Sequence, residues 1–185
     1  PGVANSYFGP NAGRPVIRGL DGDRIRMLNN GGASHDLSGL SPDHALAQDP
    51  LSLERIEVLR GPGALPYGGS AVGGVVNLID NRIPQQAMEP GAGLLGRFDI
   101  NANSGNQERS GAGLVEWGNE RWVVHVDGFR RVSGDTAVPL DLKCDRTGLT
   151  SRAICNSDNS ASGGALGASL FWDHGRLGAS VSQYA

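Results

Sequence analysis

The chain has 185 residues, of which 38% are hydrophobic and 29 are glycine, and its formal net charge is −3. It contains no run of about 18 apolar residues, which excludes a membrane-spanning helix. The nearly neutral charge and the lack of a basic run argue against nucleic-acid binding. A low hydrophobic fraction is typical of soluble chains, but also of transmembrane β-strands, in which apolar and polar residues alternate.

Residues 1–88 are predicted to form a first domain of short strands, turns and loops. Strands are expected near residues 15–18, 24–28, 55–60 and 75–79. Asp21-Gly22 and Asn30-Gly31 predict tight turns, because these residue types tolerate positive φ. A polar loop is expected from residue 32 to about residue 50.

The stretch from Leu53 to Pro84 reads LERIEVLRGPGALPYGGSAVGGVVNLIDNRIP. It joins an alternating strand, a Gly-Pro break, a glycine-rich turn and a second apolar strand. This order of elements resembles the plug domain of TonB-dependent outer-membrane receptors. The resemblance implies a mixed plug, a small β-sheet with short helices and loops, followed by transmembrane antiparallel strands of a β-barrel of about 22 strands. It also implies a location in the bacterial outer membrane and energising by TonB and its inner-membrane complex.

Residues 89–185 show the alternation that the resemblance requires. Four segments carry an apolar stripe opposite a polar one. The four stripes contain Leu94/Phe98/Ile100/Ala102, Trp122/Val124/Val126, Leu166/Ala168/Leu170/Trp172 and Leu177/Ala179/Val181. The segment 109–117 fits less well, because Leu114 and Val115 fall on opposite faces. About five strands are expected here.

The connections favour a membrane barrel over a soluble β-domain, which stays the alternative. Residues 118–120 and 173–175 predict short turns, whereas residues 133–161 predict a long loop. Outer-membrane barrels alternate in this way, with an aromatic girdle at each interface. Trp117, Trp122 and Trp172 lie beside the short turns. Five strands cannot close a barrel, and an open edge is not tolerated in lipid, so we expect a piece of a longer receptor.

The glycines of residues 61–70 do not predict a phosphate-binding loop. The Lys-Ser/Thr pair that follows the second glycine of such a loop is missing, and no helix is expected after it. Tight turns and close strand packing explain these glycines better. The chain also lacks a Gly-x-Ser-x-Gly elbow and a His-Glu-x-x-His helix, so catalysis is not expected and no bound cofactor is expected.

The loop HDLSGLSPDHALAQD, residues 35–49, is the candidate metal site. It holds the pairs His35-Asp36 and Asp43-His44, and imidazole with carboxylate suits zinc. The alternative is a solvated polar loop, because a zinc site needs three or four ligands. The segments RPVIRGLDGDRIRMLNNG, LSPDHA and DPLSLERIEVLRGP resemble the zinc-uptake branch of the family. That resemblance implies metal binding by Asp43 and His44, with further ligands from the barrel, but it gives no support to His35 and Asp36.

Cys144 and Cys155 lie in a polar stretch and could close a loop, which suits an oxidising compartment such as the periplasm or the cell surface. Two free thiols are the alternative.

The function expected is active uptake of a scarce nutrient across the outer membrane, with Zn²⁺ as the transported substrate and with the plug gating the barrel. Two alternatives remain open. The first is a receptor for an iron siderophore, haem or cobalamin, and the second is a surface β-protein for adhesion or phage attachment.

Overall fold

The computed structural model describes residues 2–7, 13–33, 52–144 and 150–185. It divides into two compact units, Pro1–Asp80 and Asn81–Ala185. The sequence predicts the boundary between the two domains at residues 88 and 89. Residues 81–85 group with the second unit because their side chains and carbonyls bond to its strands. Among the described residues, no helix has the length and hydrophobicity needed to cross a membrane.

The first unit contains a mixed four-stranded sheet with strand order β4-β3-β6-β5. Its strands are β3 (Ile25–Asn29), β4 (Gly32–Ala33), β5 (Arg55–Leu59) and β6 (Gly74–Ile79). The β3–β6 pair is parallel, and the other two pairs are antiparallel. A separate hairpin pairs β1 (Val3–Tyr7) with β2 (Gly13–Ile17). Strands therefore form close to all four predicted segments.

The helical turns in the described part of this unit are short 3₁₀ segments. They are η1 (Gly22–Arg24), η4 (Gly61–Tyr67) and η5 (Gly69–Ala71), so the glycine-rich stretch leads directly into β6. Gly74 shows why glycine is needed there. Its φ is +146°, and a Cβ would lie 2.7 Å from the carbonyl oxygen of Leu59. The glycines of this stretch thus permit close strand packing.

Two small apolar clusters hold the first unit together. Ile17, Ile25, Leu53, Val76 and Leu78 form one cluster. Leu28, Ala64, Ala71 and Val75 form the other. The strands β3 and β6 contribute to both clusters, because alternate residues of a strand point to opposite faces of the sheet. The parallel pair is thus the centre of the unit.

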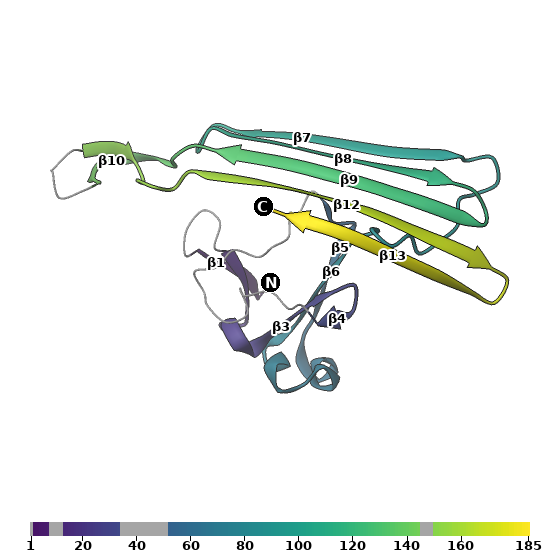
Figure 1. Ribbon diagram of the computed structural model, residues 1–185. Coiled ribbons are helices and arrows are strands. Elements are labelled where there is room, and N and C mark those ends of the chain that lie inside the picture. Colours follow the sequence, from purple (N-terminus) through teal and green to yellow (C-terminus); the bar gives the residue numbers. More distant parts are fainter. Residues whose placement is uncertain (1, 8–12, 34–51, 145–149) are drawn as a thin grey trace. The chain divides into compact units, whose positions relative to one another are not determined.

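The second unit is a five-stranded antiparallel sheet with strand order β13-β12-β9-β8-β7. Its strands are β7 (Leu94–Asn103), β8 (Glu108–Gly118), β9 (Trp122–Ser133), β12 (Asn159–Trp172) and β13 (Gly175–Tyr184). Figure 1 shows these strands lying side by side. The five strands expected from the sequence are all present.

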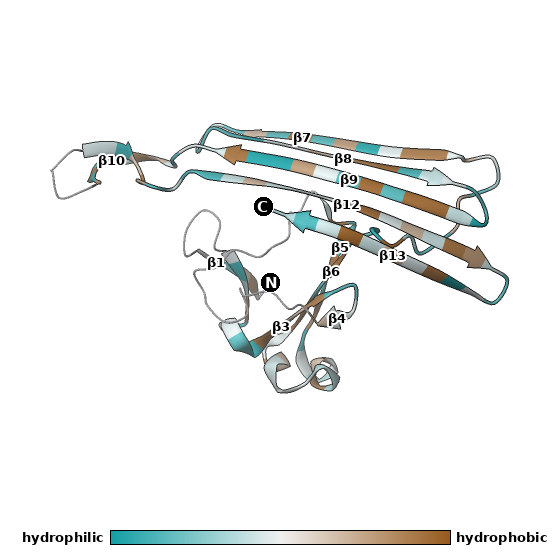
Figure 2. Cartoon of the chain, viewed as in Figure 1, coloured by the Kyte–Doolittle hydropathy of each residue, from teal (hydrophilic) through white to brown (hydrophobic). Residues whose placement is uncertain are grey.

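The register places every predicted apolar stripe on one face of this sheet, here called the apolar face. Val115, Val126, Leu166 and Val181 occupy one row across four strands. The hydropathy colours alternate along the strands in Figure 2. The weak pattern of residues 109–117 is also explained, because Gly111 and Gly113 occupy apolar-face positions on β8.

The connections differ in length at the two ends of the sheet. Residues 119–121 and 173–174 form short turns at one end. Trp117 and Trp122 meet there edge to face, with ring centroids 4.8 Å apart. The long connection from β9 to β12 lies at the other end and contains its own hairpin, β10 (Ala137–Lys143) with β11 (Thr150–Ala153). The sequence predicted this connection as a loop and missed the hairpin, although Val138, Leu140 and Leu142 alternate along β10, because its partner β11 carries no apolar stripe.

Candidate functional site

The polar face of the five-stranded sheet carries a cluster of buried charged side chains. Glu116 on β8 and His125 on β9 are directly opposite each other, and Asp127 is the next residue of β9 on the same face. Their placement follows from strand alternation, because residues two apart on a strand share a face. This agrees with the predicted stripe Trp122/Val124/Val126, which leaves His125 and Asp127 on the opposite face.

Hydrogen bonds join the three side chains. His125 Nδ1 lies 2.9 Å from Glu116 Oε1, and His125 Nε2 lies 3.1 Å from Asp127 Oδ2. Carboxylate oxygens only accept hydrogen bonds, so a ring that is protonated on both nitrogens donates to both partners. The histidine thus bridges two carboxylates, with its side chain only 3% exposed.

A fourth charged group comes from the 81–85 segment, the residues that lead into the second unit. Arg82 Nε donates to Asp127 Oδ2 at 3.2 Å, and the two side chains are 14% and 5% exposed. Asn81 Nδ2 donates to Glu116 Oε1 at 2.5 Å. Together, Glu116, His125, Asp127 and Arg82 form the wall cluster, in which two carboxylates face a guanidinium and an imidazole. Opposite charges at this burial are coupled strongly.

Two glycines of the polar face bring the same segment close to the strands. A Cβ on Gly167 of β12 would overlap the carbonyl oxygen of Arg82. A Cβ on Gly178 of β13 would lie 2.5 Å from Ile83 Cγ2. The backbone of Arg82 and the side chain of Ile83 therefore lie directly against the backbones of β12 and β13, at positions where only glycine leaves room.

The far end of the segment is held by β13. Arg176 Nη1 donates to the carbonyl oxygen of Pro84 at 3.3 Å, and Arg176 Nη2 donates to Gln85 Oε1. Pro84 is fully buried. The segment thus has contacts with β8, β9, β12 and β13. The sequence did not predict this attachment. The signal for it was the presence of two glycines, Gly167 and Gly178, on the polar face of neighbouring strands.

The wall cluster bonds the 81–85 segment to β8 and β9. The described ranges contain no group of three or more histidine, cysteine, aspartate or glutamate side chains arranged to hold a metal ion. Both ring nitrogens of His125 already face carboxylates. The metal candidates of the sequence analysis, His35, Asp36, Asp43 and His44, lie outside the described residues.

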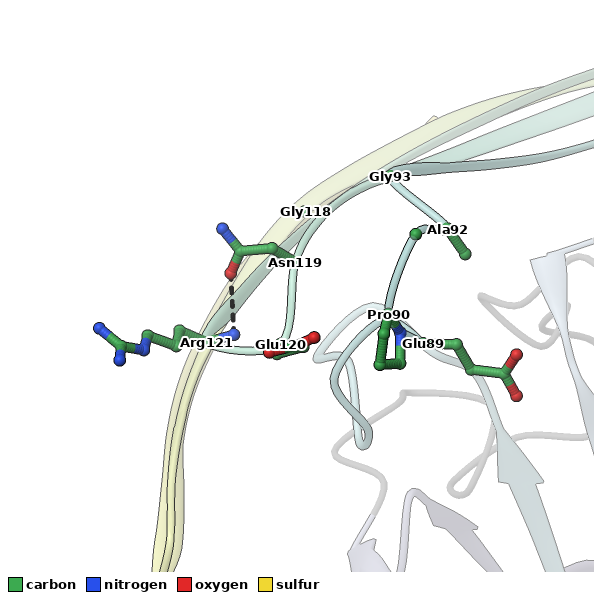
Figure 3. A pocket seen from close by; sticks show the side chains of 9 residues that line it. Glu89, Pro90, Ala92, Gly93, Gly118, Asn119, Glu120 and Arg121 are labelled. Atoms are coloured by element: carbon green, nitrogen blue, oxygen red, sulfur yellow. Dashed lines mark hydrogen bonds between the residues drawn. The ribbon is translucent and has the colours of Figure 1, made fainter.

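The short-turn end of the sheet has an open pocket of about 570 Å³. It lies between residues 89–93 and the β8–β9 connection, and Figure 3 shows its lining. Asn119 Oδ1 accepts a hydrogen bond from the backbone N–H of Arg121 at 2.8 Å, which shapes the turn. Glu89 and Arg121 point away from each other in this view. The lining therefore provides no converging side chains for a ligand.

The two cysteines and His174 lie near the ends of the strands. A disulfide joins Cys144 and Cys155, whose Cα atoms are 5.6 Å apart, beside the β10–β11 hairpin. His174 is exposed in the turn between β12 and β13. Both lie away from the wall cluster.

The two units define the class of protein: a small mixed sheet followed by antiparallel strands with one polar and one apolar face. Residues 1–75 match the family model of the TonB-dependent Receptor Plug Domain. Residues 1–75 thus match the plug domain of TonB-dependent receptors, which are proteins of the bacterial outer membrane.

Relatives and solved structures agree with this assignment. The chain is 29% identical over 143 residues to a ferrioxamine receptor of Yersinia enterocolitica, which covers 72% of this chain and 18% of that relative. It is 33% identical over 127 residues to a rhizobactin receptor of Rhizobium meliloti (strain 1021), covering 66% and 15%. The chain thus spans less than a fifth of the length of either relative.

A solved structure shares the fold. The copper transporter OprC superposes on the chain with a TM-score of 0.72 at 22% identity, covering 100% of this chain and 26% of that one. The expected fold, a plug followed by the first strands of a barrel, is confirmed. The zinc branch is not supported, because both relatives are named as receptors for siderophores.

Proposed function

We propose that the protein is a TonB-dependent outer-membrane receptor that takes up a scarce metal as its ferric siderophore complex. The observation that carries this proposal is the plug match over residues 1–75, together with two relatives named as a ferrioxamine receptor and a rhizobactin receptor. The plug blocks the barrel while substrate binds, and energy delivered through TonB rearranges it.

In this proposal the 81–85 segment is the fixed end of the plug. Its hydrogen bonds reach β8, β9 and β13, and its backbone lies against Gly167 of β12. The part of the plug that rearranges then extends only to Asn81, and residues 81–85 stay bound to the strands of the second unit. This would keep the plug attached to the barrel after each cycle.

Zinc ion is the second candidate substrate, favoured by Asp43 and His44 in the LSPDHA segment. Two ligands alone hold zinc weakly, so this candidate needs further ligands from the rest of the receptor.

Uptake assays with the full-length receptor separate the two candidates. Cells carrying it would be given ⁵⁵Fe-ferrioxamine, ⁵⁵Fe-rhizobactin or ⁶⁵Zn²⁺, each with and without a functional TonB. The proposal expects TonB-dependent uptake of a ferric siderophore that is unchanged in Asp43→Ala/His44→Ala. TonB-dependent ⁶⁵Zn²⁺ uptake that the double variant abolishes would replace it with the zinc candidate. Uptake that is independent of TonB would contradict both.

A further inference from the structure

Two arginines stand on the apolar face of the sheet, where charged side chains are unexpected. Arg130 on β9 is opposite Gly111 and Ser162, and Arg109 on β8 is opposite Ala102 and Val132. They are diagonal neighbours on adjacent strands, so their Cα atoms are about 7–8 Å apart. Two long cationic side chains can therefore reach one anion together.

Neither arginine side chain has a hydrogen bond or ion pair with any residue in the described ranges, and both residues are exposed. The arginines of the polar face differ. Arg97 Nε bonds to Asp99 at 2.9 Å, and Arg131 Nε lies 3.7 Å from Glu108. The two apolar-face guanidiniums thus carry positive charge with nothing in this part of the protein to balance it.

Their depth matches the edge of a membrane. Arg130 stands eight residues after Trp122 on β9. At about 3.3 Å per residue and a strand tilt of about 40°, this places it roughly 20 Å above the tryptophans. An outer-membrane barrel carries an apolar band about 25 Å tall, and a long arginine side chain extends further toward water. The guanidiniums thus reach the headgroup level at the end with the long connection, which is the extracellular end of such barrels.

A mostly apolar hollow of about 540 Å³ is lined on this face by residues of β7, β8 and β9, and Arg97, Leu114 and Asp127 of the same strands also border it. Phe98, Val115 and Val126 are its apolar-face side chains, and Gly113 and Gly128 leave its floor without Cβ atoms. Gly128 is two residues from Arg130 on the same face. A cationic pair at one end of an apolar hollow has the shape and charge of a site for an anionic amphiphile.

We propose that Arg109 and Arg130 bind the phosphate group of an anionic lipid of the outer leaflet, one acyl chain of which lies in the hollow beside Phe98. Guanidinium N–H groups bond to phosphate oxygens in pairs. The hydroxyl of Ser162, opposite Arg130, stands on the same face as a further donor. This site is independent of the substrate that the receptor transports, and it rests only on the outer-membrane location.

Native mass spectrometry of the full-length receptor, released from detergent with lipid A carrying two phosphates, tests the proposal. Arg109→Gln/Arg130→Gln is expected to lower lipid A retention at least tenfold. The matched control is Arg121→Gln/Arg152→Gln, which removes the same charge from a short turn and from the β10–β11 hairpin and is expected to retain lipid A as the wild type does. Heat-modifiable mobility on a gel shows that each variant is folded.

A third variant tests the hollow without changing charge. Gly128→Leu places a side chain in it, and retention is expected to fall at least threefold. Wild-type retention by Arg109→Gln/Arg130→Gln, or equal loss in the control, would overturn the phosphate site. Wild-type retention by Gly128→Leu would overturn the placement of the acyl chain.

Discussion

The two faces of the five-stranded sheet use the same residue types for opposite purposes. On the polar face, Gly167 and Gly178 let the 81–85 segment lie against the wall. On the apolar face, Gly113 and Gly128 leave a hollow. The same contrast holds for charge, because Arg97 and Arg131 are paired, whereas Arg130 has no partner among the described residues.

The environment of a residue, rather than its type, therefore decides what it contributes to stability. A buried charge must be paired, since an uncompensated one costs several kcal/mol. An exposed arginine at a membrane edge has no such requirement inside its own chain, because water and lipid headgroups are available. The following variants test whether the two faces differ in this way.

The largest effect is expected from removing a carboxylate of the wall cluster. Asp127→Ala leaves Arg82 and His125 without their shared partner, so we expect a loss of about 3–5 kcal/mol in the free energy of unfolding. The measurement is urea unfolding of the full-length receptor in lipid vesicles, followed by tryptophan fluorescence. Asp99→Ala is the matched control, since the Arg97–Asp99 pair is 46% and 42% exposed and should cost at most about 1 kcal/mol. Equal losses would remove the distinction between buried and exposed pairs.

A charge in the middle of the apolar face should cost nearly as much. Leu166→Arg places a guanidinium in the row of Val126 and Val181, and we expect a loss of about 2–4 kcal/mol. The same unfolding assay measures it. Ser162→Arg, four residues closer to the long-loop end, should cost about 0–1 kcal/mol. If the two variants lost the same stability, the depth assigned to the arginines would be wrong.

A smaller effect is expected where the 81–85 segment lies on the wall. Gly167→Ala forces the carbonyl of Arg82 to move, which should cost about 1–3 kcal/mol and increase cleavage by protease near residue 82. Gly128→Ala is the control, since its Cβ would be 3.7 Å from the nearest atom. Limited proteolysis of both variants reports the result. If Gly167→Ala were cleaved near residue 82 no faster than the wild type, the 81–85 segment would not lie against β12.

The smallest effect concerns an exposed charge of the plug. The hydrogen bond from Arg55, followed by that from Asn77, holds the pKa of the Glu57 carboxyl below its ordinary value. Because the folded-state pKa is depressed, the stabilisation is present above the unfolded pKa and is lost as the pH falls through the folded value. Carboxyl ¹³C NMR of the labelled receptor should show a low pKa that rises in Asn77→Ala. A Glu57 pKa at its ordinary value in the wild type would contradict the hydrogen bonds.

Much of the fold could be predicted because strand alternation is a local property. The stripes of β7, β9, β12 and β13 follow from residues two apart, and each was assigned to the right face. The pattern is weak on β8, because Gly111 and Gly113 stand where apolar side chains were expected. The plug was identified from a short motif, whereas the zinc branch inferred from LSPDHA found no support in the relatives.

The amino-acid sequence by itself determined the class of protein and the two faces of its strands, since these depend on period and motif alone. Only the tertiary structure decided which charges meet. Arg82 and Asp127 are 45 residues apart, and their ion pair depends on where the 81–85 segment crosses β9. The lack of a partner for Arg130 depends in the same way on the register of β8, β9 and β12. Register and chain crossing are long-range properties, which no local pattern records.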